Sequence, residues 1–526
     1  MPPLDGTVST ISLYISLDSR PRKGEYGKST IHHASNRDRP WRYDAKFVDP
    51  ANSMILIAMI KVSDIRSLDL VEHAINSVPA NGSPSGRNGE AFTCRTWVKD
   101  ALVALHDSGA IVLPTDIEAI EKKSIQTNTV LKCLSTSYSP APNMKLSTLT
   151  FFCGLVNALP PSNYLNWKTF KANGVNIGGW LHQEAVIDPR WWNQYAPGTP
   201  DEWDFCAKLG SRCGPILEQR YGSFITTKDI DAMAKAGINV IRIPTGYNAW
   251  VTVPGSQLYS GNQARFLRVI SDYAIKKHGI HVILDIHSLP GGLNGMGLGE
   301  KEGNYGWFQN QTALDYSYKA VDAAIKFIQE SDVPQGFTLA PINEPVDNRD
   351  ITKFGTPEAL SDQGAAWVLR YFQGVVSRVQ KINPKIPIML QGGFRPVDFW
   401  VKNFAANTNI VFDVHHYYFA GRPATSQNLP EFICTDAKAS AEPKFPVFVG
   451  EWSIQATSDN NFSSRAFNLN TGLQAWSRYT RGSSYWTWKF FGNVPVEGEG
   501  TQGGYWNYSE FVKMAIINPS TGISCK

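Results

Sequence analysis

The sequence has few charged side chains for its length and no long apolar run. Charged residues make up 18% of the 526 residues, and the net charge is +4. Nucleic acid is not expected as a partner at so mild a charge, because the one basic cluster is the short stretch 19–28. No run approaches the ~20 apolar residues that a bilayer-spanning helix needs, so no membrane span is expected.

Two kinds of ligand motif are also missing. There is no H-E-x-x-H and no Cys/His pair at metal-ligand spacing, although His287, His415 and His416 lie near acidic residues. We therefore expect no metal and no cofactor. No glycine-rich phosphate loop follows the first strand-like run of the downstream part, which weakens the alternative of an open, doubly wound sheet.

Cysteines are few, and their number is odd. The seven are Cys94, Cys133, Cys153, Cys206, Cys213, Cys434 and Cys525. Downstream of Cys153 four remain, an even number that fits an oxidising compartment. Cys206 and Cys213 could close a small loop, and Cys434 and Cys525 could then hold the C-terminus, but this is one of three possible connectivities.

The stretch 144–162, MKLSTLTFFCGLVNALPPS, is typical of a secretory signal peptide although it lies far inside the chain. Lys145 follows Met144, a short apolar run comes next, and V-N-A offers a cleavage site after Ala158. A buried helix or strand is the alternative. Such a signal cannot act as an N-terminal signal from mid-chain. We therefore interpret 144–158 as the boundary between two joined reading frames, with a genuine fusion as the alternative. Translation from Met144 would give a secreted extracellular or cell-wall protein.

The upstream part differs in character from the rest. We predict disorder over 1–45, a small α/β or α+β domain over 46–130, and a linker over 131–143. Within the domain, 53–62 is strand-like, and 68–78 and 95–111 have helical periodicity. Cys94 at a helix start, with His73, vaguely resembles small fungal papain-like domains; a structural cysteine or an interaction domain are the alternatives.

Downstream, strand-like runs alternate with amphipathic helical runs. The eight strand-like runs are 174–180, 238–244, 280–287, 337–344, 386–391, 409–417, 445–452 and 484–490. Eight strands, each followed by a helix or loop, predict a (β/α)8 TIM barrel over 165–526. The 16 Trp and 20 Tyr fit either a sugar-binding cleft or a large aromatic core.

Polar side chains interrupt strands that should be almost entirely apolar in a parallel barrel. The eight are Arg242, Asp285, His287, Asn343, Glu344, Asp413, His415 and Glu451. Most lie at the C-terminal ends of strands, where barrel enzymes build their active sites. Strand alternation puts His415 on the face of Asp413 and turns His416 to the other face. A polar site at this rim is therefore expected.

Two of these residues have the chemistry of glycosidic bond cleavage. Glu344 ends the fourth strand-like run and Glu451 lies near the end of the seventh, so they face each other across the barrel mouth. One carboxylic acid can protonate the leaving oxygen while the other carboxylate attacks the anomeric carbon or activates water. Each motif alone is weak, but the pair on strands four and seven is specific.

Residues from about 165 to 526 resemble the fungal exo-β-1,3-glucanase branch of glycoside hydrolase family 5, in clan A. The resemblance depends on an ordered series of motifs: GVNIGGWL, AGINVIRIPTGYNAW, LDIHSLPGGLNG, INEP, DVHHYYF, VGEWS and YWTWK. It implies a retaining β-glucosidase that releases glucose from the ends of β-1,3-glucan, with a cell-wall role and β-glucan as its partner. A monomer is expected.

The resemblance also implies roles for site residues. Glu344 would be the acid/base and Glu451 the nucleophile. Asn343 would hold the 2-hydroxyl group of the sugar, and Arg242 and Tyr417 would bond the nucleophile. His287 and His415 would bond sugar hydroxyls or the carboxylates. Trp486 would form the platform under the sugar ring.

One loop departs from the family pattern. After the N-G pair, Met296 stands where relatives have an aromatic residue that clamps sugar, and Trp307 is a possible substitute. The alternatives that stay open are β-1,6-glucan cleavage, endo action, transglycosylation and a non-catalytic glucan-binding protein.

Overall fold

The computed structural model divides the chain into two compact units, Met1–Val156 and Asn157–Lys526. It describes residues 161, 163–442 and 444–525. Before them it describes five strands, one helix and the neighbouring positions 74, 77–79, 83–89, 108–109, 113 and 116–117. Each unit is treated separately below.

The N-terminal unit holds an antiparallel five-stranded sheet in the order β3-β2-β1-β5-β4. The strands are β1 Thr10–Ser16, β2 Ser29–Ser35, β3 Arg42–Val48, β4 Met59–Ile65 and β5 Ser147–Phe152. Strands β1, β2 and the start of β3 lie within the range 1–45, and the disorder expected there stays a prediction. The linker 131–143 lies outside the described residues.

Helix α2, Cys94–Asp107, confirms the helix predicted from the spacing of apolar residues in 95–111. Strand β4 overlaps the predicted strand 53–62, while of the predicted helix 68–78 only position 74 is described as helical. Strand β5 lies inside the signal-like stretch and pairs with β1 and β4. The structure thus gives those residues a sheet position, and their export role stays a prediction.

The second unit is a closed barrel of eight parallel strands, which confirms the predicted TIM barrel. The strands are β6 Ala172–Asn176, β7 Val240–Gly246, β8 His281–Ser288, β9 Phe337–Ala340, β10 Ile388–Gln391, β11 Ile410–Tyr418, β12 Val447–Ala456 and β13 Gly482–Tyr485. Each overlaps one of the eight predicted runs. The barrel closes where β13 pairs with β6.

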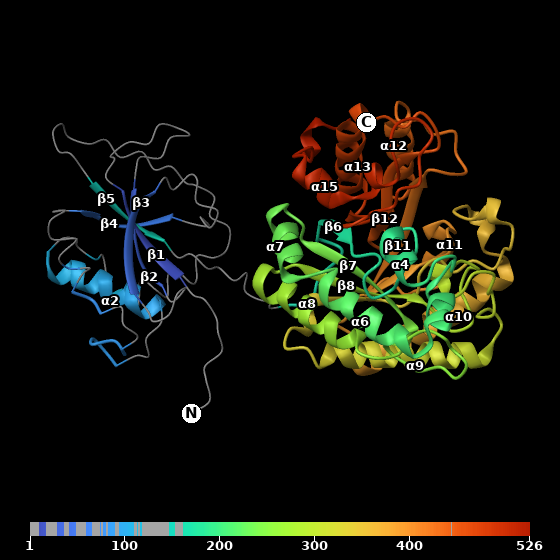
Figure 1. Cartoon of the computed structure of the whole chain (residues 1–526), viewed down its shortest axis with the longest axis horizontal. Helices are drawn as coiled ribbons and strands as arrows, with labels where there is room; N and C mark the ends of the chain where they lie inside the picture. The colour runs from blue at the N-terminus through green and yellow to red at the C-terminus, as the bar shows by residue number, and fades with distance from the viewer. Residues whose placement is uncertain are drawn as a thin grey trace. The chain divides into compact units, whose positions relative to one another are not determined.

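Helices surround the strands, as the labels α6, α8, α9 and α10 around β7 and β8 show in Figure 1. Their bounds are α4 Pro189–Tyr195, α5 Glu202–Leu209, α6 Cys213–Ser223, α7 Thr227–Lys235, α8 Gln263–His278, α9 Gln311–Gln329, α10 Asp362–Ile382, α11 Val397–Val401, α12 Leu429–Ala439, α13 Arg465–Tyr479, α14 Gly503–Trp506 and α15 Tyr508–Lys513. Among the described residues, no helix is long and apolar enough to cross a membrane.

An apolar layer closes the N-terminal end of the barrel interior. It consists of Trp167, Ala172, Val240, Ile283, Ala340, Met389, Val411 and Phe448, all buried. Trp167 lies across this end and donates its indole N–H to Thr338 Oγ1 over 3.0 Å. Because strand side chains alternate, the next inward position lies two residues further along each strand. That position begins the polar part of the barrel.

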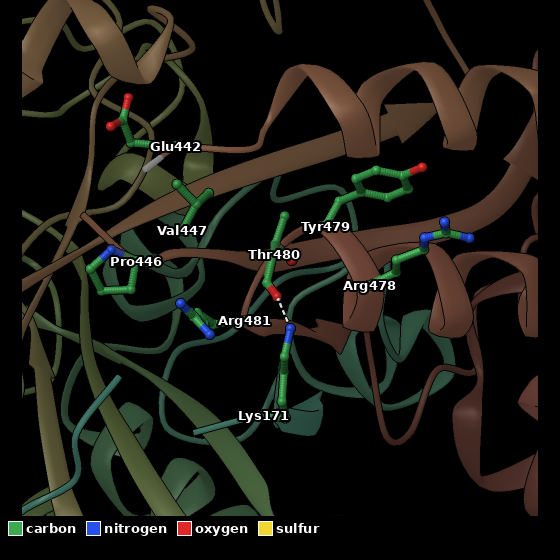
Figure 2. A pocket seen from close by; sticks show the side chains of 8 residues that line it. All are labelled: Lys171, Glu442, Pro446, Val447, Arg478, Tyr479, Thr480 and Arg481. Atoms are coloured by element: carbon green, nitrogen blue, oxygen red, sulfur yellow. Dashed lines mark hydrogen bonds between the residues drawn. The ribbon is translucent and has the colours of Figure 1, made fainter. Parts of the chain in front are cut away.

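A small cavity of about 130 Å³ lies beside the starts of β6, β12 and β13 (Figure 2). Lys171 lies between Arg478 and Arg481 in this view. Its ammonium group donates to the carbonyl oxygens of Ser477 and Thr480, over 2.6 and 2.7 Å. Lys171 therefore satisfies carbonyl groups at the C-terminal end of α13.

Two disulfides, Cys206–Cys213 and Cys434–Cys525, join the four downstream cysteines, which is one of the three connectivities that the sequence left open. The second links α12 to the last described residue over a separation of 91 residues. The first spans 7 residues.

Loop length predicts that these two disulfides differ in their effect on stability. The Cys434→Ser/Cys525→Ser variant should lose about 4.5 kcal/mol of unfolding free energy, because a long loop regains more freedom in the unfolded chain. The Cys206→Ser/Cys213→Ser variant is the matched control and should lose less. Denaturant unfolding of both variants measures the difference; an equal loss would contradict the loop-length explanation.

Candidate active site

The polar side chains of the barrel form a layer directly above the apolar one. Arg242, Asp285, Gln391 and Asp413 each lie two residues after a member of the apolar layer, and all four are buried. Two residues further along their strands, His287 and His415 form the next level at the mouth. The period of two thus accounts for the site lying inside the barrel at the C-terminal end of its strands.

Glu451 on β12 is held by two donors. Arg242 Nη1 lies 2.7 Å from its Oε1, and the Tyr417 hydroxyl donates to its Oε2 over 2.7 Å. Glu451 as a whole is 4% exposed, so these contacts are shielded from water. Both oxygens therefore have fixed partners, and the side chain is oriented toward the cleft.

Arg242 is fully buried and surrounded by acidic groups. Besides Glu451, its guanidinium lies 3.1 Å from Asp285 Oδ2 and 3.8 Å from Asp413 Oδ2. Burial opposes the charge, but the charges of Asp285 and Glu451 outweigh it, and the pKa of Arg242 is raised. Burial also raises the pKa of Asp285 to about 6, with the Arg242 charge opposing the rise. The arginine is thus a permanent cation beneath the nucleophile candidate.

Glu344 lies beyond the end of β9, which stops at Ala340 because Pro341 has no N–H for the ladder. The sequence prediction extended this strand to 344. Glu344 has φ +44°, in the left-handed region, so strand alternation does not govern its direction and it joins Asn343 in the site. Its carbonyl accepts from Asn294 Nδ2 over 3.2 Å, which helps to hold this strained turn.

The Glu344 carboxyl group contacts His415, with Oε1 2.7 Å from Nδ1. Burial raises the pKa of Glu344, and the hydrogen bond and charge of His415 oppose the rise. For His415 burial lowers the pKa, but the charges of Glu451 and Asp413 raise it to about 10. A carboxyl group with a raised pKa can hold a proton at working pH, as a general acid requires.

The two glutamates lie close enough to act on one bond. One carboxylate oxygen of each and a ring nitrogen of His415 all lie within 4.8 Å of one another. Retaining glycosidases have carboxyl groups about 5–5.5 Å apart, whereas inverting enzymes leave about 6.5–9.5 Å for a water molecule. The distance between these two carboxylate oxygens is therefore shorter than the range of inverting enzymes.

The other predicted site residues lie beside this pair. Asn343 accepts from Arg242 Nη2 over 2.7 Å, and its amide nitrogen lies 3.2 Å from His287 Nε2. His287 stacks on Trp486 with ring centroids 5.8 Å apart. The structure thus brings together all eight residues singled out as catalytic or substrate-binding. His416 has other partners: it stacks on Trp476 with ring centroids 5.2 Å apart and lies 3.0 Å from Ser440 Oγ, on the other face of the strand as alternation predicted.

Sequence reasoning missed two residues that line the same cleft, Glu184 and Trp506. Glu184 follows β6; its Oε1 is shielded from solvent without a hydrogen-bond partner among the described residues. Burial, with the charges of Glu451 and Glu344, raises its pKa to about 8. The sequence feature that could have indicated Glu184 is its position shortly after the first strand of the barrel. Trp506 stacks on Tyr417, with centroids 5.4 Å apart, and no strand pattern marks it.

The cleft has a volume of about 810 Å³ and runs from the two glutamates past several apolar side chains. The apolar side chains include Met296, Phe354, Phe394, Phe419 and Phe490. Phe354 and Phe394 meet edge to face, with centroids 5.0 Å apart. Trp307 is fully buried and donates to Ser317 Oγ, so it packs in the core and does not replace the aromatic residue at Met296.

The downstream part has Asn-x-Ser/Thr glycosylation sequons at Asn310, Asn461 and Asn507, and these asparagines differ in accessibility. Asn310 is exposed, whereas Asn507 is 4% exposed and donates to the carbonyl of Phe490. The folded protein has no room for a glycan at Asn507.

A family model described as Cellulase (glycosyl hydrolase family 5) matches residues 211–492, more than half of the chain. The chain belongs to glycosyl hydrolase family 5. It is accordingly an O-glycosyl hydrolase, which confirms the family expected from the motifs.

Solved structures and curated proteins give two kinds of relative for this family 5 chain. The rutinosidase from Aspergillus niger is 52% identical and covers 68% of this chain and 100% of its own, with a TM-score of 0.67. Probable glucan 1,3-beta-glucosidase A of Aspergillus niger is 31% identical over 56% of this chain and 67% of its own. Glucan 1,3-beta-glucosidase 1 of Schizosaccharomyces pombe is 29% identical over 55% of this chain and 69% of its own.

The upstream part matches a different model. Residues 17–129 are similar to a family of unknown function (DUF6914). The family 5 match begins far downstream of it, so different family models match the two parts of the chain.

Proposed function

We propose that the barrel is a retaining β-glycosidase in which Glu344 is the acid/base and Glu451 the nucleophile. The observation that carries the proposal is the placement of the two carboxyl groups, within 4.8 Å and with different partners. Glu451 accepts from Arg242 and Tyr417, while burial raises the pKa of Glu344. One group is thereby suited to be an anion and the other an acid.

In the first step Glu451 attacks the anomeric carbon as the bond from that carbon to the leaving oxygen breaks. Glu344 gives its proton to the leaving oxygen, so the aglycone departs as an alcohol and the sugar is esterified to Glu451. Asn343 and His287 lie where they can bond sugar hydroxyls, and Trp486 supplies a flat apolar face for the ring. Departure of the alcohol leaves Glu344 as a carboxylate.

In the second step Glu344 takes a proton from water as the water oxygen attacks the anomeric carbon. The ester bond to Glu451 breaks, which restores both glutamates and releases a sugar with its original anomeric configuration. His415 remains in contact with Glu344 throughout and balances its charge after the proton has left.

For the substrate we propose a rutinoside, in which the disaccharide rutinose is joined to an aglycone through its glucose. The support is the 52% identity to a rutinosidase over that protein's whole chain, against about 30% for the glucan 1,3-beta-glucosidases. The apolar residues of the cleft, among them Phe354, Phe394 and Phe419, suit an apolar leaving group.

The second candidate is the exo-cleavage of β-1,3-glucan, with release of glucose in cell-wall remodelling or degradation. The curated relatives' names favour it. We also propose that the enzyme is secreted, which the two disulfides support because disulfides form in oxidising compartments.

Incubation with rutin and with laminarin, followed by product chromatography, separates the two substrates. We expect rutinose and free aglycone from rutin, and a lower specificity constant on laminarin. Proton NMR during the first minutes should show the β-anomer before mutarotation. A first-formed α-anomer would exclude the retaining mechanism, and faster glucose release from laminarin would make the glucan the substrate.

A further inference from the structure

The pattern Asp-x-His occurs twice in the barrel interior, as Asp285 and His287 on β8 and as Asp413 and His415 on β11. In each pair the aspartate lies one level below its histidine, as strand alternation requires. Asp285 Oδ2 lies 2.7 Å from His287 Nδ1, and Asp413 Oδ2 lies 3.4 Å from His415 Nε2. Asp413 has no role in the proposed steps above, yet it is a buried carboxylate.

Asp413 also contacts the strand that carries the nucleophile. Its Oδ1 accepts from the backbone N–H of Gly450 over 2.8 Å, and Gly450 directly precedes Glu451. A Cβ at position 450 would lie 2.1 Å from Asp413 Oδ1 and 2.5 Å from Oδ2. Glycine is therefore required at 450 as long as the Asp413 carboxylate stays where it is.

On its other side Asp413 contacts His415, whose Nδ1 lies 2.7 Å from Glu344 Oε1 and 3.6 Å from Glu451 Oε2. A continuous path of contacts thus runs from the Gly450 N–H through Asp413 and His415 to Glu344. We propose that Asp413 is a positioning residue, which accepts the Nε2–H of His415 and thereby keeps a charged Nδ1–H donor on Glu344. This role rests on the proposed function of Glu344.

An asparagine at 413 would place a hydrogen-bond donor, in place of an acceptor, opposite His415 Nε2. The Gly450 N–H is a donor, so the side-chain oxygen must face it and the NH₂ group must face His415. An NH₂ group cannot accept the Nε2–H, so the imidazole loses that proton and remains neutral, with its proton on Nδ1. Glu344 would then have a neutral donor in place of a charged one.

The charged and titratable groups that face His415 come from several strands. They are Glu344 after β9, Glu451 on β12, Asp413 on its own strand, Arg242 on β7, and Asp285 and His287 on β8. The His415 cation lowers the pKa of Glu344, against the larger effect of burial. Loss of that cation therefore raises the pKa of Glu344, and its proton is lost at higher pH.

The test is the pH profile of kcat/KM for the full-length Asp413→Asn variant on aryl β-glycosides. The alkaline limb of this profile reports the loss of the proton from Glu344 in the free enzyme. Its midpoint should shift to higher pH by about one unit. The loss of rate should be larger for 4-nitrophenyl than for 2,4-dinitrophenyl glycosides, since the better leaving group needs less protonation. An unmoved limb with equal losses on both substrates would make Asp413 structural only.

Asp285→Asn is the matched control, because it alters the other Asp-x-His pair and does not contact Glu344. It should lose activity equally on both leaving groups, without a shift of the alkaline limb. If Asp413→Asn does not fold, as judged by circular dichroism, Gly450→Ala tests the same contact by displacing the Asp413 carboxylate. The same upward shift is expected, and its absence in a folded Gly450→Ala protein would contradict the proposal.

Nitrogen-15 NMR of histidine-labelled protein is independent of turnover. In the wild type His415 should be an imidazolium at neutral pH, and in Asp413→Asn a neutral ring protonated at Nδ1. An imidazolium in both would overturn the positioning role. Absence of β-glycoside hydrolysis by the wild type would instead refute the proposed function alone, since the NMR result would still stand.

Discussion

Replacement of Glu451 by alanine is expected to lower kcat/KM by at least about 10⁴-fold, or about 5.5 kcal/mol in activation free energy. Without the carboxylate, no nucleophile remains to form the glycosyl ester. Arg242 and Tyr417 would also face a space where their anionic partner had been. Initial rates on 4-nitrophenyl β-glucoside or rutinoside measure the loss.

Azide shows whether Glu451 is the nucleophile. In Glu451→Ala, azide can enter the vacated space and attack from the same side as the missing carboxylate, giving the α-glycosyl azide. Trapping of the wild type with a 2-deoxy-2-fluoro glycoside of dinitrophenol should add the sugar mass to the peptide that contains Glu451. A β-glycosyl azide from this variant, or a label on another residue, would refute the assignment.

Replacement of Glu344 by alanine should have the second largest effect, and its size should depend on the leaving group. For 4-nitrophenyl glycosides we expect a loss of about 10²–10⁴-fold in kcat/KM, because a general acid supplies that much. For 2,4-dinitrophenyl glycosides the first step should remain fast, since the leaving group departs without a proton. Burst kinetics then reveal a glycosyl-enzyme that water attacks slowly.

The azide product again distinguishes the role. In Glu344→Ala, azide attacks the ester to Glu451 from the acid/base side, so it should accelerate turnover and give the β-glycosyl azide. The Glu451→Ala protein is the matched control, with the opposite anomer expected. Equal losses on both leaving groups, without azide acceleration, would mean that Glu344 does not transfer the proton.

The barrel and its central residues could be predicted from the sequence because they follow local rules. Alternation of strand-like and helical runs gave eight strands, and each overlaps a strand of the closed barrel. The period of two separated His415 from His416, and the structure places them as expected. Such patterns depend on neighbours a few residues apart, so a single sequence is enough to see them.

Other features depend on groups far apart in the chain. The sequence placed Glu344 on a strand, whereas β9 ends at Ala340 and a left-handed backbone directs the side chain. Trp506 reaches the cleft from beyond the last strand, and Trp307, an open possibility in the sequence, packs in the core. The pairing of β1 Thr10–Ser16 with β2 Ser29–Ser35, and of β2 with β3 Arg42–Val48, likewise joins segments that lie apart in the sequence.

By itself the sequence determined the barrel, the two glutamates and the residue types around them, because periodicity and strand ends fix which side chains share a rim. Only the tertiary structure decided which partners each of those side chains contacts. The distance between the carboxyl groups, the enclosure of Arg242 by three acids and the contact of Asp413 with Gly450 all arise from strands brought together by closure of the barrel. Burial and charge act over a few ångströms in space, whatever the separation along the chain.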